Sequence, residues 1–228
     1  MVESRQKRPR MGQYEFLFFA ILAVIIFRPL LRDGFFGLMI LNILTSAILI
    51  SSAYAVSGHP KTLRVSLVLL VPAFIASWST AFVSELWPMA VSRILILAFV
   101  GYIMYVMAMD ILSEKNVTRD TIFGSACVYM LLGFAFTDIY MLFLIIEPQS
   151  FGQVIDIAPV GSEVKISSDL SYFSFVTLTT LGYGDVTPKT GMVQGLATLE
   201  AMLGQFYLTV LVARLVGLHL AGSTLTTE

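Results

Sequence analysis

Six long apolar runs constrain the fold of this chain more than any other feature of its sequence. Polar links separate these runs, which cover Met11–Phe27, Phe35–Tyr54, Leu63–Phe82, Leu86–Ile111, Thr121–Ile146 and Met192–Leu220. A helix needs about 20 apolar residues to cross the hydrocarbon of a bilayer. Of the 228 residues, 57% are hydrophobic and 13% are charged, a balance typical of membrane proteins. We therefore expect an all-α membrane protein with six transmembrane helices.

A seventh apolar segment, Leu170–Thr180, lies between the fifth and sixth runs and is too short to cross. Ser168 or Asp169 is a suitable N-cap for a helix of about three turns that ends near Thr179. Backbone that enters the membrane without crossing it must be shielded by protein or line a water-filled cavity. The segment is therefore predicted to be a re-entrant pore helix.

The basic residues predict the orientation of these spans. Four precede the first run, and the links after the second and fourth runs and the end of the sixth hold five more. These nine residues are Arg5, Lys7, Arg8, Arg10, Lys61, Arg64, Lys115, Arg119 and Arg214, against Arg28, Arg32, Arg93, Lys165 and Lys189 on the other side. Because lysine and arginine favour the cytoplasmic side, both termini are expected there, in a multi-pass protein of the cell membrane.

The residues after the short helix, Thr180-Leu181-Gly182-Tyr183-Gly184, have the composition of a cation-binding strand. The partly negative C-terminal end of the preceding helix favours a cation. Gly182 and Gly184 permit backbone angles that are closed to other residues, so successive carbonyl groups can face one side. Four such strands would form oxygen cages for dehydrated K⁺ ions, with the Thr180 hydroxyl as a lower ring. One strand per chain predicts a homotetramer with its pore on the fourfold axis.

The stretch Thr177-Leu-Thr-Thr-Leu-Gly-Tyr-Gly-Asp185 resembles the potassium-channel signature. Glu147-Pro-Gln-Ser-Phe151 before it, and Leu199–Leu208 with Ala213–Gly217 after it, resemble the two-helix ion-channel domain of bacterial potassium channels. The resemblance covers about Thr121–Leu220. It implies a selectivity filter at Thr180–Gly184 that holds K⁺ ions, and a potassium-selective channel that conducts K⁺ down its gradient.

Two positions depart from the commonest pattern of that family. Leu181 replaces the usual valine, which should be tolerated because the carbonyl group meets the ion. Tyr172 and Phe173 stand where many voltage-gated channels have paired tryptophans. In that alignment Tyr172 either supports the filter through a hydrogen bond to Asp185 or only packs behind it.

Two acids and one glycine within the predicted spans are further candidates. Asp138 and Glu200 are acids within predicted spans, where ionisable groups are usually paired with another polar group. By analogy with inward rectifiers, Glu200 should support the filter from behind, near Thr177 or Thr179, either as a pH-sensitive gating group or as a structural hydrogen-bond partner. Gly204 resembles the hinge glycine of inner helices, but glycine also permits close helix packing. The role of Asp138 stays open.

The outer loop before the filter carries more acidic than basic residues. Glu147, Asp156, Glu163 and Asp169 stand against Lys165. Four copies of this loop would give a negative vestibule that concentrates cations, whereas the alternative is a solvated loop with incidental charge.

The fourth run has the position of a voltage sensor but not its charges. It holds one arginine, Arg93, where a sensor has several at every third position. Four Arg93 side chains crossing the whole field would supply about 9 kcal/mol per 100 mV, against the tens that steep gating uses. Voltage dependence should therefore be weak, which leaves the gating stimulus unknown.

Three regions follow from these patterns: a four-helix membrane domain over 1–112, a cytoplasmic linker over 113–120, and a pore domain over 121–228. Expected partners are further copies of the chain, membrane lipids and an unidentified regulatory ligand or subunit, but no nucleic acid. The chain is not expected to be an enzyme, because His59 and His219 lie far apart without ligand spacing.

Three other functions remain as alternatives. Potassium transporters resemble four degenerate filters in one longer chain, whereas this chain has one filter. An accessory subunit would assemble without conducting. A poorly selective cation channel is closer in kind, because pore flexibility as well as sequence governs discrimination.

Overall fold

The computed structural model describes residues 12–31, 35–58, 60–82, 85–114, 117–152 and 162–224. This part of the chain is built of helices: α1 (Gln13–Phe27), followed by the short 3₁₀ helix η1 (Arg28–Leu30), α2 (Phe35–Ala55), α3 (Pro60–Ser79), α4 (Leu86–Ser113), α5 (Arg119–Ile146), α6 (Ser162–Leu178) and α7 (Gly191–Thr224). All of these except η1 and α6 are long and apolar enough to cross a membrane. The expected all-α class is confirmed, with six candidate spans in the positions predicted.

Local signals explain where α3 and α5 begin. Pro60 occupies the first position of α3, where its missing N–H is not needed. Thr118 caps α5: its side chain accepts a hydrogen bond from the Thr121 amide, while the Thr121 side chain accepts one from the Thr118 amide. The predicted linker over 113–120 is therefore shorter in the structure, since Ser113 ends α4 and Arg119 begins α5.

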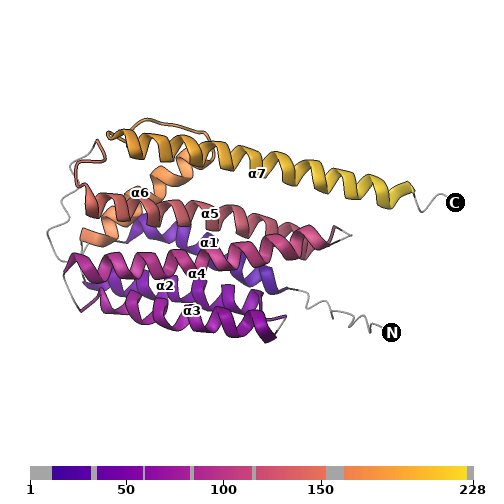
Figure 1. Ribbon diagram of the computed structural model, residues 1–228, viewed down its shortest axis with the longest axis horizontal. Helices are drawn as coiled ribbons and strands as arrows, with labels where there is room; N and C mark the ends of the chain where they lie inside the picture. The colour runs from indigo at the N-terminus through magenta and orange to yellow at the C-terminus, as the bar shows by residue number, and fades with distance from the viewer. Residues whose placement is uncertain are drawn as a thin grey trace.

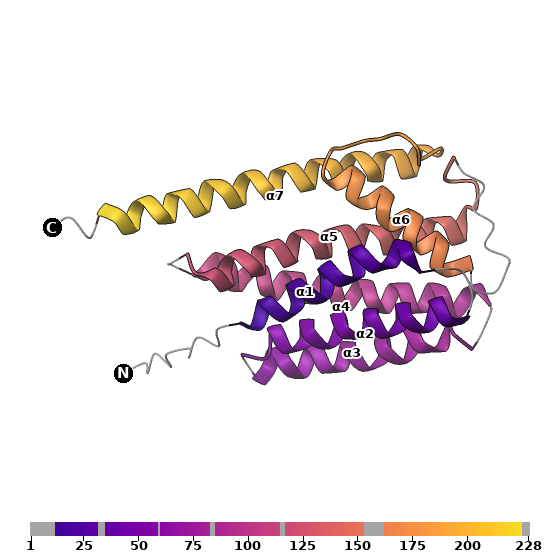
Figure 2. The same ribbon diagram turned by 180° about the vertical axis from the view of Figure 1, so that it is seen from behind.

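The helices form two layers around α5 (Figure 1). α2, α3 and α4 lie side by side, α1 crosses between α2 and α5 (Figure 2), and α4 packs between α3 and α5. On the other side of α5, α6 slants between α5 and the long α7. The start of α1 and the end of α7 lie at the same end of the molecule.

The apolar core has two main parts that share α5. One part joins α1, α2, α3, α4 and α5 and includes Leu17 and Ile21 of α1, Phe99 of α4 and Leu131 of α5. The other part joins α5, α6 and the start of α7 through residues such as Tyr140 and Leu170. The first four helices therefore pack directly on the outer helix of the predicted pore domain, although the sequence separated the two regions.

The predicted start of the pore helix at Ser168 or Asp169 is wrong. α6 begins at Ser162 and is 17 residues long, although its end at Leu178 is within one residue of the prediction. Val164 is fully buried against Leu38 and Leu41 of α2, and Ile166 is buried in the second part of the core. These contacts stabilise two further turns, which the scattered polar residues of this segment do not predict.

Candidate functional site

The segment Thr180–Gly184 follows α6 directly and is joined to its last turn by backbone hydrogen bonds. The Thr180 amide donates to the Thr177 carbonyl at 2.9 Å, and the Leu181 amide donates to the Val176 carbonyl at 2.9 Å. The Gly182 amide lies 3.3 Å from the same Val176 oxygen. The chain therefore turns sharply at the C-terminal end of α6, the end whose partial negative charge favours a cation.

Left-handed backbone angles alternate along this segment. The φ angles of Thr180, Gly182 and Gly184 are 59°, 60° and 78°. The residues between them, Leu181 and Tyr183, have no such angle. This alternation allows successive carbonyl groups to face the same side, the arrangement that a dehydrated cation requires. The sequence predicted the unusual angles of the two glycines but not that of Thr180, because threonine rarely adopts a positive φ.

The side chains of the segment are open in a single chain. Leu181 is 55% exposed and Tyr183 is 67% exposed. Figure 1 shows the chain after α6 running back along the first turns of α7. The segment lies at the surface next to α7.

Asp185 follows the segment and contacts Tyr172 of α6. Tyr172 donates a hydrogen bond to the Asp185 carboxylate, and the Val186 amide donates another at 3.0 Å. The hydrogen bond from Tyr172 lowers the pKa of Asp185, because it stabilises the charged form. The structure thus brings together the two residues that the sequence paired, and Tyr172 keeps 39% of its surface exposed.

Glu200 of α7 lies behind α6 and is fully buried. Its carboxyl group contacts the Tyr140 hydroxyl of α5 at 2.6 Å and the Ser174 hydroxyl of α6 at 2.5 Å. The sequence predicted a pore-helix hydroxyl as the partner but named the wrong ones, Thr177 and Thr179. The Thr179 hydroxyl instead donates to the Phe175 carbonyl at 2.7 Å.

The oxygen–oxygen contacts around Glu200 outnumber the protons that the neighbouring hydroxyl groups supply. The Ser174 hydroxyl also lies 2.7 Å from the Gly133 carbonyl oxygen of α5. Together with the two contacts of Glu200, this makes three oxygen pairs, whereas the Ser174 and Tyr140 hydroxyls supply two protons. All three contacts are complete only when the carboxyl group carries a proton. Glu200 therefore joins α5, α6 and α7 most fully as a neutral acid.

Gly204 lies one turn further along α7, against the end of α6. A Cβ atom at this position would come within 2.5 Å of the Leu178 carbonyl oxygen and 2.9 Å of its side chain. The same oxygen accepts a hydrogen bond from the Tyr129 hydroxyl of α5 at 3.1 Å. The structure shows close packing at Gly204, and α7 continues through it as one helix. Its role as a gating hinge stays a prediction.

The segment after α5 pairs with the chain that follows Asp185. Phe151 forms an isolated antiparallel bridge with Pro188, in which the Gly152 amide donates to Thr187 and the Lys189 amide to Ser150, both at 2.8 Å. The Phe151 ring also packs with Tyr140 and Phe173, at centroid distances of 5.8 and 5.3 Å. The sequence did not predict this aromatic cluster, although Phe151 belongs to a flank that carried the resemblance.

Two of the four acids of the predicted vestibule have described side chains: Asp169 in α6 is half-buried, and Glu147 follows α5. Asp156 is not described, and the side chain of Glu163 is not described. Glu147 is exposed at the end of α5. His59 and the side chain of His219 also fall outside the described part of the chain.

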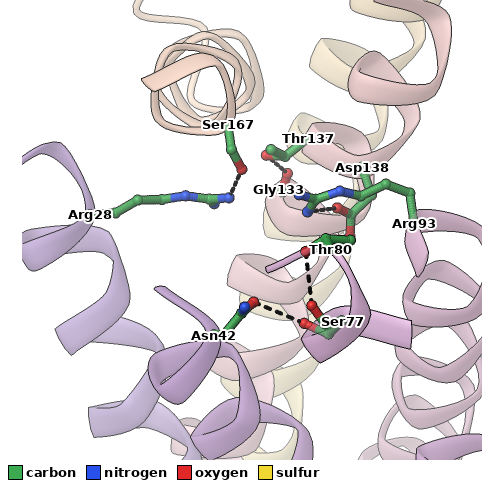
Figure 3. Close-up of polar contacts among 9 residues, drawn as sticks. All are labelled: Arg28, Asn42, Ser77, Thr80, Arg93, Gly133, Thr137, Asp138 and Ser167. Atoms are coloured by element: carbon green, nitrogen blue, oxygen red, sulfur yellow. Dashed lines mark hydrogen bonds and ion pairs between the residues drawn. The ribbon is translucent and has the colours of Figure 1, made fainter. Parts of the chain in front are cut away.

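A second polar cluster joins η1 and α4 to α6 and α5 (Figure 3). Arg93 of α4 and Asp138 of α5 form a buried ion pair, with Nη1 3.0 Å from Oδ1. Arg28 of η1 is also buried and donates a hydrogen bond to Ser167 of α6. The structure thus supplies the partner of Asp138 that the sequence left open, and it places Arg93 in a fixed contact.

Comparisons with known proteins find a match in the C-terminal part of the chain. A family model described as "Ion channel" matches residues 143–218, which contain the end of α5, all of α6, the segment Thr180–Gly184 and most of α7. Protein LctB of Geobacillus stearothermophilus is 37% identical over 90 residues, which are 38% of this chain and 62% of that protein. No solved structure matches the chain. The C-terminal part of the chain is therefore similar to an ion channel domain, and the chain spans less than two thirds of the length of Protein LctB.

Proposed function

We propose that this protein is the pore subunit of a potassium-selective channel, with Thr180–Gly184 as its selectivity filter. The observation that carries the proposal is the alternation of left-handed angles at Thr180, Gly182 and Gly184 directly after a helix end that favours a cation. Carbonyl groups in this arrangement replace the hydration shell of K⁺. Tyr172, Asp185 and Glu200 support the filter from outside the ion path.

The functional unit in this proposal is a homotetramer in the cell membrane, with both termini in the cytoplasm. One filter strand supplies a quarter of each ion cage, so a closed ring requires four copies. Exposed apolar side chains along α7 suit contacts with neighbouring copies and with lipid; Phe206, Val210 and Val212 are 61%, 60% and 56% exposed. The helical fold and the ion channel domain point away from an enzyme.

Ion flux into liposomes tests the proposal. Purified protein reconstituted into K⁺-loaded liposomes should conduct K⁺. The variant Gly182→Ala should lose most of this flux, because alanine at a φ of 60° strains the filter backbone. Gly101→Ala is the matched control: Gly101 lies in α4 without a positive φ, and a Cβ atom there meets nothing within 4 Å.

Three outcomes would contradict the proposal. Absence of flux from well-assembled protein would favour an accessory subunit. Equal flux of K⁺ and Na⁺ would favour a poorly selective cation channel. Equal loss of flux in Gly182→Ala and Gly101→Ala would remove the special role of the filter backbone.

A further inference from the structure

Arg214 of α7 connects the inner end of that helix to the first four helices. Its Nη1 atom donates to the Ile111 carbonyl at 2.5 Å, and its Nη2 atom donates to the carbonyl groups of Leu112 and Glu114 at 2.7 and 2.9 Å. α4 ends at Ser113 and Glu114 is its C-cap, so the acceptors are among the last carbonyl groups of α4 or follow it directly. One guanidinium group thus holds the C-terminal end of α4.

The chemistry of a helix end explains why an arginine suits this place. The last four carbonyl groups of a helix have no donor within the helix and carry a partial negative charge. A guanidinium group presents several N–H donors in a rigid fork and stays charged at every accessible pH. Arg214 therefore satisfies several acceptors at once, which a lysine in its place would do less completely.

Arg214 lies on the face of α7 that contacts the rest of its own chain. Glu200, Gly204, Tyr207 and Arg214 follow one another at intervals of four, three and seven residues, which places them on one side of a helix. The first three contact α5 and α6; the Tyr207 hydroxyl donates to the Ser125 carbonyl at 2.8 Å. Arg214 continues this line of contacts beyond α5 and α6 to α4.

We propose that Arg214 is a positioning residue that ties the inner end of the pore-lining helix to α4, so that movements of the first four helices change the opening of the pore. The proposal rests on the channel function proposed above. In a tetramer with the filter on the axis, the face of α7 that Arg214 occupies points toward its own chain. The hydrogen bonds to α4 then hold the end of α7 away from the axis, in the direction that keeps the pore wide.

The test compares three variants in bilayer recordings of the full chain: Arg214→Gln, Arg214→Lys and the control Arg64→Gln. Arg64 is an exposed arginine in the first turns of α3, and the start of α3 lies at the same end of the molecule as the end of α4. We expect Arg214→Gln to lower the open probability by about fivefold or more, within the range of allosteric couplings. The open probability of Arg214→Lys should lie between those of Arg214→Gln and the unmodified protein. The open probability of Arg64→Gln should equal that of the unmodified protein.

A second measurement follows the contact itself, independently of conduction. Leu112 is 57% exposed, whereas the native Cys127 is fully buried, so a nitroxide label can be attached at Leu112→Cys. The label should become more mobile when Arg214→Gln is added and should stay unchanged with Arg64→Gln. This comparison tests the Arg214 contact even where no current is found, so that its failure is distinguishable from a failure of the channel proposal.

Unchanged open probability in Arg214→Gln, or an equal loss in Arg64→Gln, would overturn the proposal. An increase in open probability would overturn the direction in which Arg214 holds α7. If Arg214→Gln does not assemble, Arg214→Lys becomes the test of the proposal, because lysine keeps the positive charge but lacks the guanidinium N–H groups that bind several carbonyl groups at once. An unmodified open probability and label mobility in that variant would also overturn the proposal.

Discussion

Glu200 of α7 is the residue that contacts both α5 and α6 behind the segment Thr180–Gly184 proposed as the filter. The analogy with inward rectifiers predicted this position, and the cost of an acid at membrane depth predicted a polar partner. It could not identify Tyr140 and Ser174, because those contacts depend on how α5 and α6 rotate about their axes when they pack. Residues 60 and 26 positions away in the sequence meet Glu200 only in the assembled fold.

The effect of replacing Glu200 on stability and K⁺ flux should depend on whether the new side chain can donate a hydrogen bond. Glutamine has an acceptor for Tyr140 and N–H donors for Ser174, so Glu200→Gln should keep the fold and the K⁺ flux. Glu200→Ala removes the partner of the buried Tyr140 hydroxyl, at a cost of about 1–3 kcal/mol, whereas the Ser174 hydroxyl keeps its contact with the Gly133 carbonyl. Thermal unfolding of the detergent-solubilised protein and K⁺ flux check both variants. Equal stability of the two variants would contradict the hydrogen-bond network.

Tyr172 and Asp185 form a hydrogen-bonded pair that we propose supports the filter. The pair leads to a prediction about the pH dependence of the current. The hydrogen bond from Tyr172 lowers the pKa of Asp185, so the carboxylate is the stabilised form. The stability that this hydrogen bond contributes is complete above the ordinary pKa of Asp185. It is lost as the pH falls through the lowered pKa of Asp185 in the folded protein. Tyr172→Phe should therefore shift the acid-induced loss of current to higher pH.

Currents recorded while the outer solution is acidified measure this shift. Tyr105→Phe is the matched control, because Tyr105 of α4 is 64% exposed and far along the chain from the filter. An identical pH profile for Tyr172→Phe and the unmodified protein would show that the hydrogen bond does not support the filter.

At the scale of the helices, the sequence predicted the spans because each is a long apolar run. It failed at the start of α6, where Val164 and Ile166 alternate with polar residues and their burial depends on α2 and α5. It also left the role of Gly204 undecided, because a glycine in an apolar run is compatible with both bending and packing. A Cβ atom built on Gly204 would come too close to the Leu178 carbonyl oxygen, so the backbones of α7 and α6 approach each other closely at this point. This close approach favours the packing role.

Gly204→Ala should therefore disturb the contact between α6 and α7. The added Cβ atom would lie 2.5 Å from a backbone oxygen, so one of the helices must move. Overpacking of this kind costs about 1–3 kcal/mol. Gly217→Ala is the control in the same helix, because a Cβ atom at Gly217 meets nothing within 4 Å. Equal thermal stability of the two variants would contradict the packing role.

In the whole molecule, α1 and α4 pack on α5, which also contacts α6 and α7. The ion pair of Arg93 and Asp138 is buried at the contact of α4 and α5. From the sequence Arg93 was a lone candidate for a gating charge and Asp138 an acid without a known partner. The pair could not be predicted, because 45 residues separate its members and neither position has a distinctive pattern.

A buried ion pair that holds two helices together should not move in the membrane field. Removal of one partner, as in Arg93→Gln, should destabilise the protein by about 3–5 kcal/mol, whereas the double variant Arg93→Met with Asp138→Leu should be nearly neutral. Conductance–voltage curves of the double variant should have the same shallow slope as those of the unmodified protein. A slope that falls in the double variant would show that Arg93 is a gating charge.

The reversal potential is the direct measure of the potassium selectivity proposed for this protein. The purified protein is placed in a planar bilayer with K⁺ as the cation on one side and Na⁺ on the other. A filter built from Thr180–Gly184 predicts a reversal potential far from zero, in the direction of the K⁺ equilibrium potential. A reversal potential near zero would contradict the account.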